Sequence, residues 1–106
     1  MKVKGRFDHF NINVTDLDKS IKFYETALGL HESHRKEASD GSFVLVYMAD
    51  DHSNFFLELT WLRDHTQPYE LGENESHLCL RVEGDYDEVR KFHKEMGCVR
   101  SEERRV

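Results

Sequence analysis

The sequence repeats itself at an offset of 68 residues, and no other feature limits the fold as strongly. The offset superposes His9 on His77 and Gly29 on Gly97. It also superposes apolar positions, namely Ile12 on Leu80, Val14 on Val82, Ile21 on Val89, Tyr24 on Phe92 and Leu28 on Met96. Self-similarity at a fixed period marks a repeated structural unit. The sequence therefore predicts two related units, each beginning with a histidine-bearing strand followed by a helix.

The first copy has the periodicities of one helix among four strands. Apolar residues alternate over 7–14, which predicts a strand. Thr15 or Asp16 can cap a helix that runs to about Leu28, and Gly29 is suited to end it. The remaining strands are a weakly apolar one at 30–38 and, after a turn at 39–41, two strong ones at 43–48 and 55–61.

The second copy contains fewer elements. After a loop at 63–74, the patterns predict a strand at 76–83 and a helix at 85–96, and a last strand could open at Cys98. The equivalent of Glu58 would fall at position 126, beyond the 106 residues of the chain. We therefore expect a single α+β domain over 1–106, in which 1–63 form a βαβββ unit and 75–106 a partial, C-terminally truncated second unit.

Three side chains form a candidate metal site. His9 and His77 occupy equivalent places on two repeat-related strands, and Glu58 lies within an apolar strand. A carboxylate is costly to bury there unless it is paired or bound to a metal. Two imidazoles and a carboxylate suit a divalent transition metal. A lone strand-end histidine is usually solvated or hydrogen-bonded, but the repeat symmetry together with Glu58 favours the metal site.

The other potential ligands are predicted to have ordinary structural roles. They are His31, His34, His52, His65 and His93, which lie in charged or polar stretches, and Cys79 and Cys98, which lack the close spacing of a zinc knuckle. Two cysteines are too few for a disulfide framework, so both are expected to be reduced thiols.

Charge and hydropathy exclude several classes of partner. The formal net charge is −6, and basic residues are interleaved with acidic ones, which argues against a nucleic acid or an anionic membrane as partner. No stretch approaches the roughly 18 apolar residues of a membrane span, and no apolar segment follows the charged start. A cytoplasmic protein without a membrane partner is expected.

Several motifs resemble one known enzyme family. Phe7-Asp8-His9-Phe10, then 16–24 and Leu28-Gly29-Leu30, resemble the opening of glyoxalase I and its vicinal-oxygen-chelate relatives. Leu57-Glu58-Leu59-Thr60 resembles that family's metal-binding strand. Tyr69-Glu70-Leu71-Gly72 is similar to the bacterial lactoylglutathione lyases in particular. The resemblance covers almost the whole chain and implies a glyoxalase-like fold of paired βαβββ units.

The resemblance also implies a site and a reaction. The family binds a metal through His-Glu-His-Glu, and His9, Glu58 and His77 match the first three ligands. Glu102 and Glu103 come too early to match the fourth, which belongs near position 126. The implied metal is Ni²⁺ or Co²⁺ rather than Zn²⁺, and the implied assembly is a homodimer. The implied reaction converts a 2-oxoaldehyde–thiol adduct to a thioester, with Glu58 or the fourth carboxylate as the base.

Two positions depart from the glutathione-using pattern. Asn13, the candidate substrate-binding residue, stands where the bacterial enzymes carry arginine, and Leu62 stands where they carry asparagine. These departures leave the thiol open. The alternatives are an enzyme similar to methylmalonyl-CoA epimerase, an iron oxygenase with two histidines and one carboxylate, and an inactive truncated binding protein. Without the fourth carboxylate, weak or no lyase activity is expected from the 106 residues alone.

Overall fold

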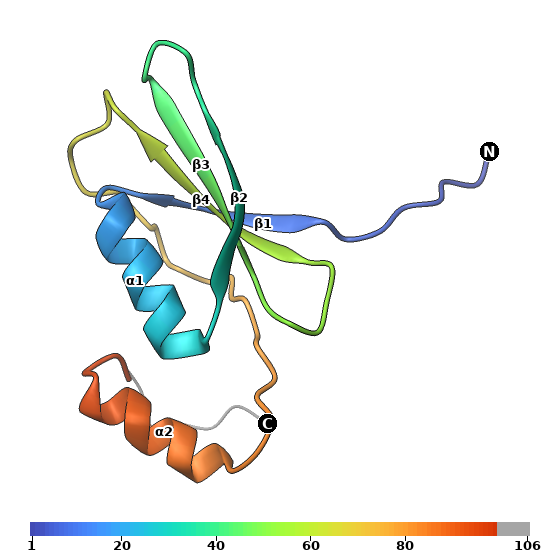
Figure 1. The fold of residues 1–106 in the computed structure, drawn as a ribbon, viewed down its shortest axis with the longest axis vertical. Helices are drawn as coiled ribbons and strands as arrows, with labels where there is room; N and C mark the ends of the chain where they lie inside the picture. The colour runs from blue at the N-terminus through green and yellow to red at the C-terminus, as the bar shows by residue number, and fades with distance from the viewer. Residues whose placement is uncertain (100–106) are drawn as a thin grey trace. The chain divides into compact units, whose positions relative to one another are not determined.

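A computed structural model describes residues 1–99 of the chain and divides it into two compact units, Met1–Glu70 and Leu71–Val106. The protein is α+β (Figure 1). Its elements are β1 (His9–Val14), α1 (Leu17–Leu28), β2 (His31–Glu37), β3 (Phe43–Ala49), β4 (Phe56–Leu62) and α2 (Tyr86–Glu95). All five elements predicted for the first copy are confirmed, and their ends differ from the prediction by one or two residues.

The first unit is a four-stranded sheet in the order β1-β4-β3-β2. The edge strand β1 pairs in parallel with β4, whereas β3 pairs antiparallel with both β4 and β2. The connection from β1 to β2 runs through α1 and carries the chain across the sheet from one edge to the other (Figure 1). This is the βαβββ arrangement that the sequence predicts.

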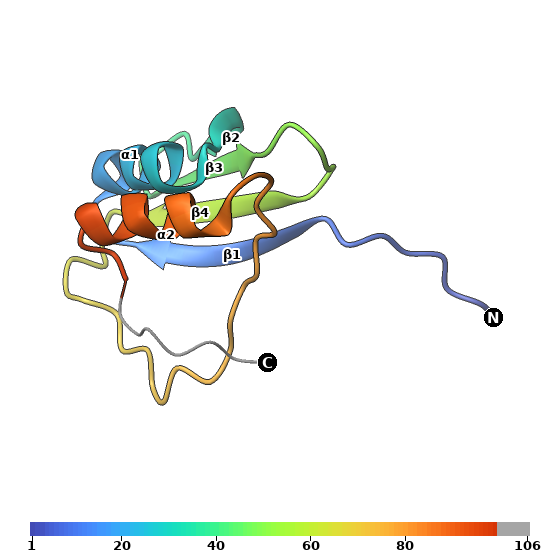
Figure 2. The ribbon, with the colours of Figure 1, turned by 90° about the horizontal axis from the view of Figure 1, so that it is seen from below.

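One face of the sheet forms the core of this unit, and α1 lies over it (Figure 2). Val46 and Leu59, on adjacent strands, are fully buried, and Met48 is 1% exposed. The helix contributes its predicted apolar stripe, which consists of Leu17, Ile21, Tyr24 and Leu28. Because alternate residues of a strand point to opposite faces, the residues between these core positions are left for the other face.

Local chemistry fixes both ends of α1. The N-cap is Asp16, whose carboxylate accepts a hydrogen bond from the Lys19 amide at 3.1 Å. This bond satisfies one of the amide groups that have no partner within the helix. Gly29 follows the last turn with a φ of 66°, a left-handed conformation that favours glycine. The predicted ends of the helix are therefore confirmed together with their cause.

The strand β2 forms although all seven of its residues are exposed. It lies at the outer edge of the sheet, where charged side chains remain in water and discourage pairing with other chains. Glu32 and Arg35 form a bidentate ion pair on it. The register against β3 shifts between Glu32 and His34, so that one extra residue, Ser33, bulges from the strand.

The second unit contains α2, which is capped by the Asp85 side chain through a 2.8 Å bond from the Asp87 amide. The strand predicted for 76–83 is wrong for this structure, since those residues have no strand assignment. In the first unit the corresponding strand β1 is held by hydrogen bonds to β4. The positions that would correspond to β4 fall at about 124–130 by the repeat, and the chain has 106 residues.

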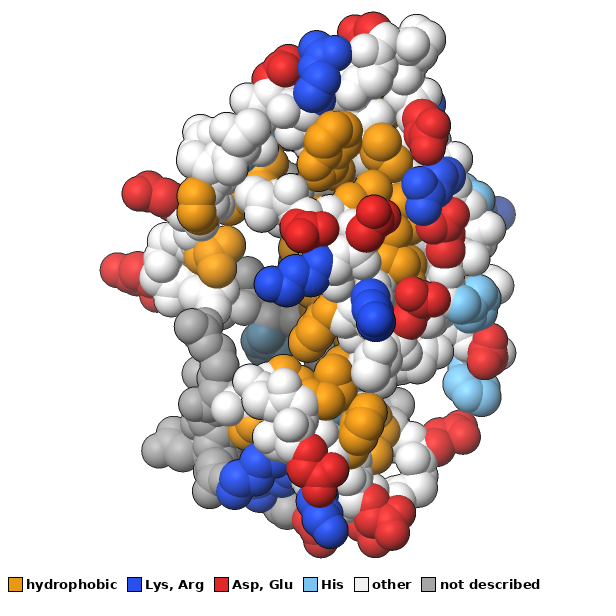
Figure 3. All heavy atoms as spheres, turned by 60° about the vertical axis from the view of Figure 1, so that its left-hand side comes forward, with side chains coloured by type: hydrophobic (Ala, Val, Ile, Leu, Met, Phe, Trp, Pro, Cys, Tyr) orange, Lys and Arg blue, Asp and Glu red, His pale blue; other side chains and the backbone are white. Residues whose placement is uncertain are grey.

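The strand expected to open at Cys98 lies mostly outside the described residues, and Cys98 and Val99 themselves are not in a strand. Among residues 1–99, no helix has the length and apolar character needed to cross a membrane. On the face drawn in Figure 3, acidic and basic side chains are interspersed, and apolar side chains lie exposed between them.

The burial of Leu59 generates a prediction about stability. Leu59→Ala should lower the free energy of unfolding by about 2–5 kcal/mol, because it removes apolar contacts and leaves a cavity between the sheet and α1. Chemical denaturation monitored by circular dichroism measures the change. Lys22→Ala, at an exposed position of α1, is the control and should shift stability by less than about 0.5 kcal/mol. Equal effects of the two substitutions would contradict the assigned core.

Candidate functional site

The parallel pairing of β1 with β4 brings the two predicted ligands of the first unit together. Asn11 lies opposite Glu58 in the register, and His9 lies two residues before Asn11 on the same face. The Nε2 atom of His9 is 3.4 Å from Oε2 of Glu58. Both side chains are on the sheet face opposite α1. Two residues 49 positions apart in the sequence thus form one pair.

Glu58 is the only charged or polar side chain among the buried residues of the described chain, and it is 8% exposed. Its backbone neighbours Leu57 and Leu59 are part of the core on the other face. The carboxylate is compensated by several groups: the His9 imidazole, the Thr60 hydroxyl at 3.4 Å and the Tyr47 hydroxyl. A buried carboxylate needs such partners because its desolvation is costly.

The orientation of His9 is fixed from its other side. Its Nδ1 atom lies 2.7 Å from Oδ2 of Asp8, which leaves Nε2 directed toward Glu58. The hydrogen bond with Asp8 raises the pKa of the imidazole above its usual value, and the charge of Glu58 adds to this effect. The same bond lowers the pKa of the Asp8 carboxyl. Asp8 therefore supplies the carboxylate partner that metal-ligating histidines commonly have.

The donor pair fits a divalent metal. An imidazole nitrogen and a carboxylate oxygen are both suitable ligands for a divalent transition metal, and here the two donor atoms lie 3.4 Å apart. Across residues 1–99, however, no three His, Cys, Asp or Glu side chains converge closely enough to hold an ion. His9 and Glu58 are therefore a pair of donors that still needs further ligands.

An aromatic cluster borders Glu58 on the same face. Tyr47 lies directly opposite Glu58 in the β3–β4 register. Its ring stacks on His34, with centroids 4.4 Å apart, and meets His9 and Phe56 edge-on. The hydrogen bond to Glu58 raises the pKa of Tyr47 to about 12, and burial adds to the shift. The phenol therefore stays protonated throughout the neutral range.

A polar row continues the same face along β1. Thr60 donates a hydrogen bond to the side-chain oxygen of Asn11, and Asn11 donates to Asn13 at 2.9 Å. Asn13 is exposed, as a side chain that contacts a substrate should be before binding. Its role in substrate binding stays a prediction.

His77, the third predicted ligand, belongs to the second unit. It is exposed, and it lies in the stretch 76–83 that has no strand assignment. Glu102 and Glu103, considered for the fourth position, lie outside the described residues. The structure thus brings together two of the three predicted ligands, both within Met1–Glu70, and the role of His77 stays a prediction.

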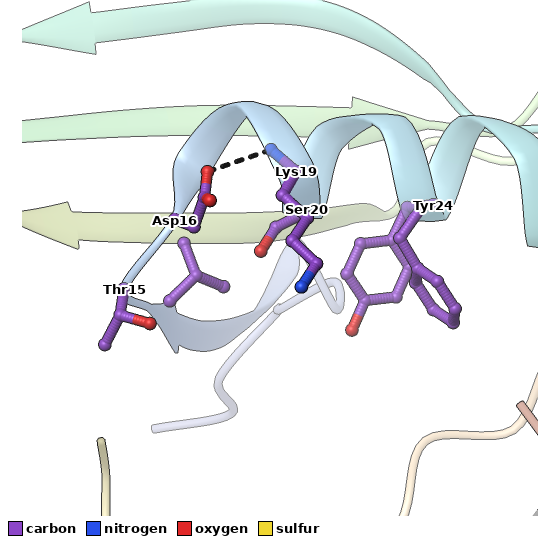
Figure 4. A pocket seen from close by; sticks show the side chains of 7 residues that line it. Thr15, Asp16, Lys19, Ser20 and Tyr24 are labelled. Carbon is purple, nitrogen blue, oxygen red and sulfur yellow. Dashed lines mark hydrogen bonds between the residues drawn. The ribbon is translucent and has the colours of Figure 1, made fainter.

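A separate hollow of about 550 Å³ lies where β1 meets α1, and Figure 4 shows its lining. Lys19, Ser20 and Tyr24 direct polar groups toward it, while Asp16 is occupied as the helix cap. The hollow shares no residue with the His9–Glu58 pair.

A comparison with family models identifies the fold. Residues 6–96 match the model described as the Glyoxalase/Bleomycin resistance protein/Dioxygenase superfamily. The chain belongs to this superfamily. The matched residues include β1, β4 and the two donors that those strands bring together.

Individual relatives of this glyoxalase superfamily member agree with the family match. It is 31% identical over 96 residues to a lactoylglutathione lyase of Neisseria meningitidis and 35% identical over 95 residues to a probable lactoylglutathione lyase of Synechocystis. These alignments cover 89% and 86% of this chain and 69% and 70% of the relatives. The trypanothione-dependent glyoxalase I of Leishmania major matches 89% of this chain and 68% of its own with a TM-score of 0.76 and 30% identity.

Sequence reasoning missed the aromatic half of the site. It assigned His34 an ordinary role in a charged stretch and did not single out Tyr47 or Asp8. Tyr47 could have been found, because it alternates with the core residues Val46 and Met48 and so must face the side of Glu58. His34 gives no such signal, since its orientation depends on the bulge at Ser33.

The contact between Asp8 and His9 predicts how the imidazole titrates. In metal-free protein, His9 should have a pKa above the usual value of about 6.5. Asp8→Asn should lower it, because a neutral amide no longer favours the charged imidazolium. An NMR titration of the imidazole measures both values. Asp18→Asn, in the exposed first turn of α1, is the matched control and should leave the His9 titration unchanged. A midpoint at or below 6.5 in the unsubstituted protein would contradict this account.

Proposed function

We propose that the protein is a metal-dependent lyase that converts the hemithioacetal of methylglyoxal and a thiol to an S-lactoyl thioester. The observation that carries the proposal is the His9–Glu58 pair, whose donor atoms lie 3.4 Å apart on the sheet face opposite α1 in a glyoxalase-superfamily fold. The names of the relatives support the same reaction, since two of them are lactoylglutathione lyases by name.

In this proposal, His9, Glu58 and His77 hold a divalent metal. Three protein ligands leave coordination positions open, as in catalytic sites. The metal, when bound, supplies Lewis-acid stabilisation of the negative charge that develops on the substrate oxygens. The proposed ion is Ni²⁺ or Co²⁺, as in the bacterial lyases that the motifs resemble.

Glu58 is the proposed general base. Its carboxylate takes the proton from the hemithioacetal carbon, and the electron pair of that C–H bond moves into the carbon–carbon bond as negative charge develops on the neighbouring carbonyl oxygen. Glu58 then returns the proton to that neighbouring carbon, while the proton of the hemithioacetal hydroxyl moves to the oxygen on the neighbouring carbon, so that the first carbon becomes the thioester carbonyl. One C–H bond is broken and one is formed, so no oxidant or reductant is consumed.

Asn13 bears on the choice of thiol. It offers a neutral amide on the site face, two residues along from Asn11, at a position where the related bacterial lyases carry arginine. An amide binds an anionic group of the thiol more weakly than a guanidinium does. We therefore propose that glutathione is not uniquely preferred. The names of the relatives include two different thiols: glutathione for the Neisseria meningitidis enzyme and trypanothione for the Leishmania major enzyme.

The proposed reaction is tested by thioester formation from methylglyoxal with glutathione, trypanothione and a small neutral thiol, each compared in the same assay. Ni²⁺ or Co²⁺ added to metal-free protein should restore more turnover than Zn²⁺. Turnover by the 106 residues alone is expected to be weak, and Glu58→Gln should lower this kcat further, by about 10²–10⁴-fold, because an amide cannot accept the proton. Glu25→Gln, at an exposed position of α1, is the matched control. Unchanged turnover in Glu58→Gln, or full restoration by Zn²⁺ alone, would overturn the assignment.

We also propose that the protein forms a homodimer. Within the first unit, β1 pairs on one side only, and a free strand edge is prone to further pairing. Phe7, just before β1, is 91% exposed, and Phe10 on β1 is 39% exposed. Burial of such side chains in an interface would be favourable.

Sedimentation velocity at micromolar concentration should therefore detect a dimer. Phe7→Ser together with Phe10→Ser should weaken it, because both substitutions remove apolar area beside the free edge. Lys22→Ser, at an exposed position of α1, is the control. A monomer at every concentration tested would contradict the proposal.

A further inference from the structure

Tyr47 on β3 is the neighbour of Glu58 on the adjacent strand β4. The two residues are direct partners in the β3–β4 register, so their side chains lie next to each other on the sheet face opposite α1. Hydrogen bonding with the Glu58 carboxylate is the largest cause of the raised pKa of Tyr47. A carboxylate has two oxygens with about four acceptor sites, so this bond leaves others free for His9, Thr60 or a metal ion.

The Tyr47 ring is held in place by three other rings. It lies parallel to His34, at an interplanar angle of 8° and a centroid distance of 4.4 Å. His9 and Phe56 meet it at 88° and 85°, with centroids 5.7 and 6.2 Å away. Offset-stacked and edge-on contacts are the favourable arrangements of aromatic rings. These contacts hold the Tyr47 ring in one place beside Glu58, its partner in the register.

The bulge in β2 explains why His34 can contribute. Glu32 lies opposite Met48, a core position, whereas His34 lies opposite Tyr47. In a regular strand Ser33 would face Tyr47, and His34 would face the next partner along β3. The extra residue re-aims His34 onto the face of Glu58, as bulges beside functional sites commonly do. The Ser33 hydroxyl, 3.1 Å from Nδ1 of His34, ties the bulged residue to the imidazole.

We propose that Tyr47 is a positioning residue, which fixes the Glu58 carboxylate beside His9 for metal binding, and that His34 in turn fixes Tyr47. This inference rests on the proposed function, in which Glu58 is a metal ligand. Partners of metal ligands set the orientation of those ligands, and their loss typically weakens metal binding or activity by about 10–100-fold. Tyr47 acts through Glu58 and does not itself bind the ion or take the proton.

The decisive variant is Tyr47→Phe, which keeps the ring and removes only the hydroxyl. Competition of metal-free protein with a chromophoric chelator for Ni²⁺ and Co²⁺ measures affinity. Tyr47→Phe should bind both ions about 10-fold more weakly. The visible absorption spectrum of the Co²⁺-loaded variant should also differ, because the carboxylate is no longer held in one orientation. Tyr24→Phe, on the opposite side of the sheet, should change neither the affinity nor the spectrum.

Two substitutions at His34 test the second half of the inference. His34→Ala removes the stacked ring and should reproduce part of the loss of affinity. His34→Phe retains a ring that can stack on Tyr47 and should restore affinity to within about 2-fold of the unsubstituted protein. Thermal unfolding measured alongside confirms that each variant is folded. Unchanged affinity and an unchanged Co²⁺ spectrum in Tyr47→Phe would overturn the positioning role.

His9→Ala and Glu58→Gln separate this inference from the function on which it rests. If these two variants lose metal binding and Tyr47→Phe does not, the positioning role is wrong and the metal site stands. If neither His9→Ala nor Glu58→Gln weakens metal binding, the proposed function is wrong and the positioning role falls with it.

Discussion

The parallel pairing between β1 and β4 is the interaction on which the remaining structure depends. Six consecutive residues of each strand are in register, from His9 opposite Phe56 to Val14 opposite Trp61. This single register decides both faces at once, because a shift by one residue would exchange them. It directs Ile12 and Leu59 toward α1, and it leaves His9 and Glu58 on the other face. The core and the donor pair therefore have the same origin.

Burial of Glu58 is the cost that this arrangement carries. A carboxylate between Leu57 and Leu59 would be destabilising if it were left without partners. The neighbouring strands supply these partners, since β1 contributes His9 and β3 contributes Tyr47. An apolar residue at position 58 would be easier to accommodate, because buried polar clusters often contribute little net stability. The polar cluster is therefore better explained by the proposed metal site than by a need for stability.

The sequence predicted most of the first unit, because the signals for its elements are local. The ends of α1 follow from Asp16 and Gly29, which satisfy or release backbone groups within one turn. The strand at 76–83 was wrong for the opposite reason. Alternation of Leu78 and Leu80 with polar residues shows that the segment is compatible with a strand, but a strand exists only where another strand completes its hydrogen bonds. The residue pattern within 76–83 does not show whether such a neighbouring strand is present.

The same distinction applies to the candidate site. The pairing of His9 with Glu58 was predictable, since Glu58 interrupts an apolar strand and the repeat indicated which histidine to choose. The environment of Glu58 was not predictable to the same depth, because it depends on three strands and on a bulge. Without the extra residue at Ser33, the imidazole of His34 would face away from Tyr47, and the phenol would lose the ring stacked against it. A polar edge strand with little apolar content thus shapes the site through one irregularity in its register. Function in such a sheet is encoded as much in the alignment of its strands as in the identity of its ligands.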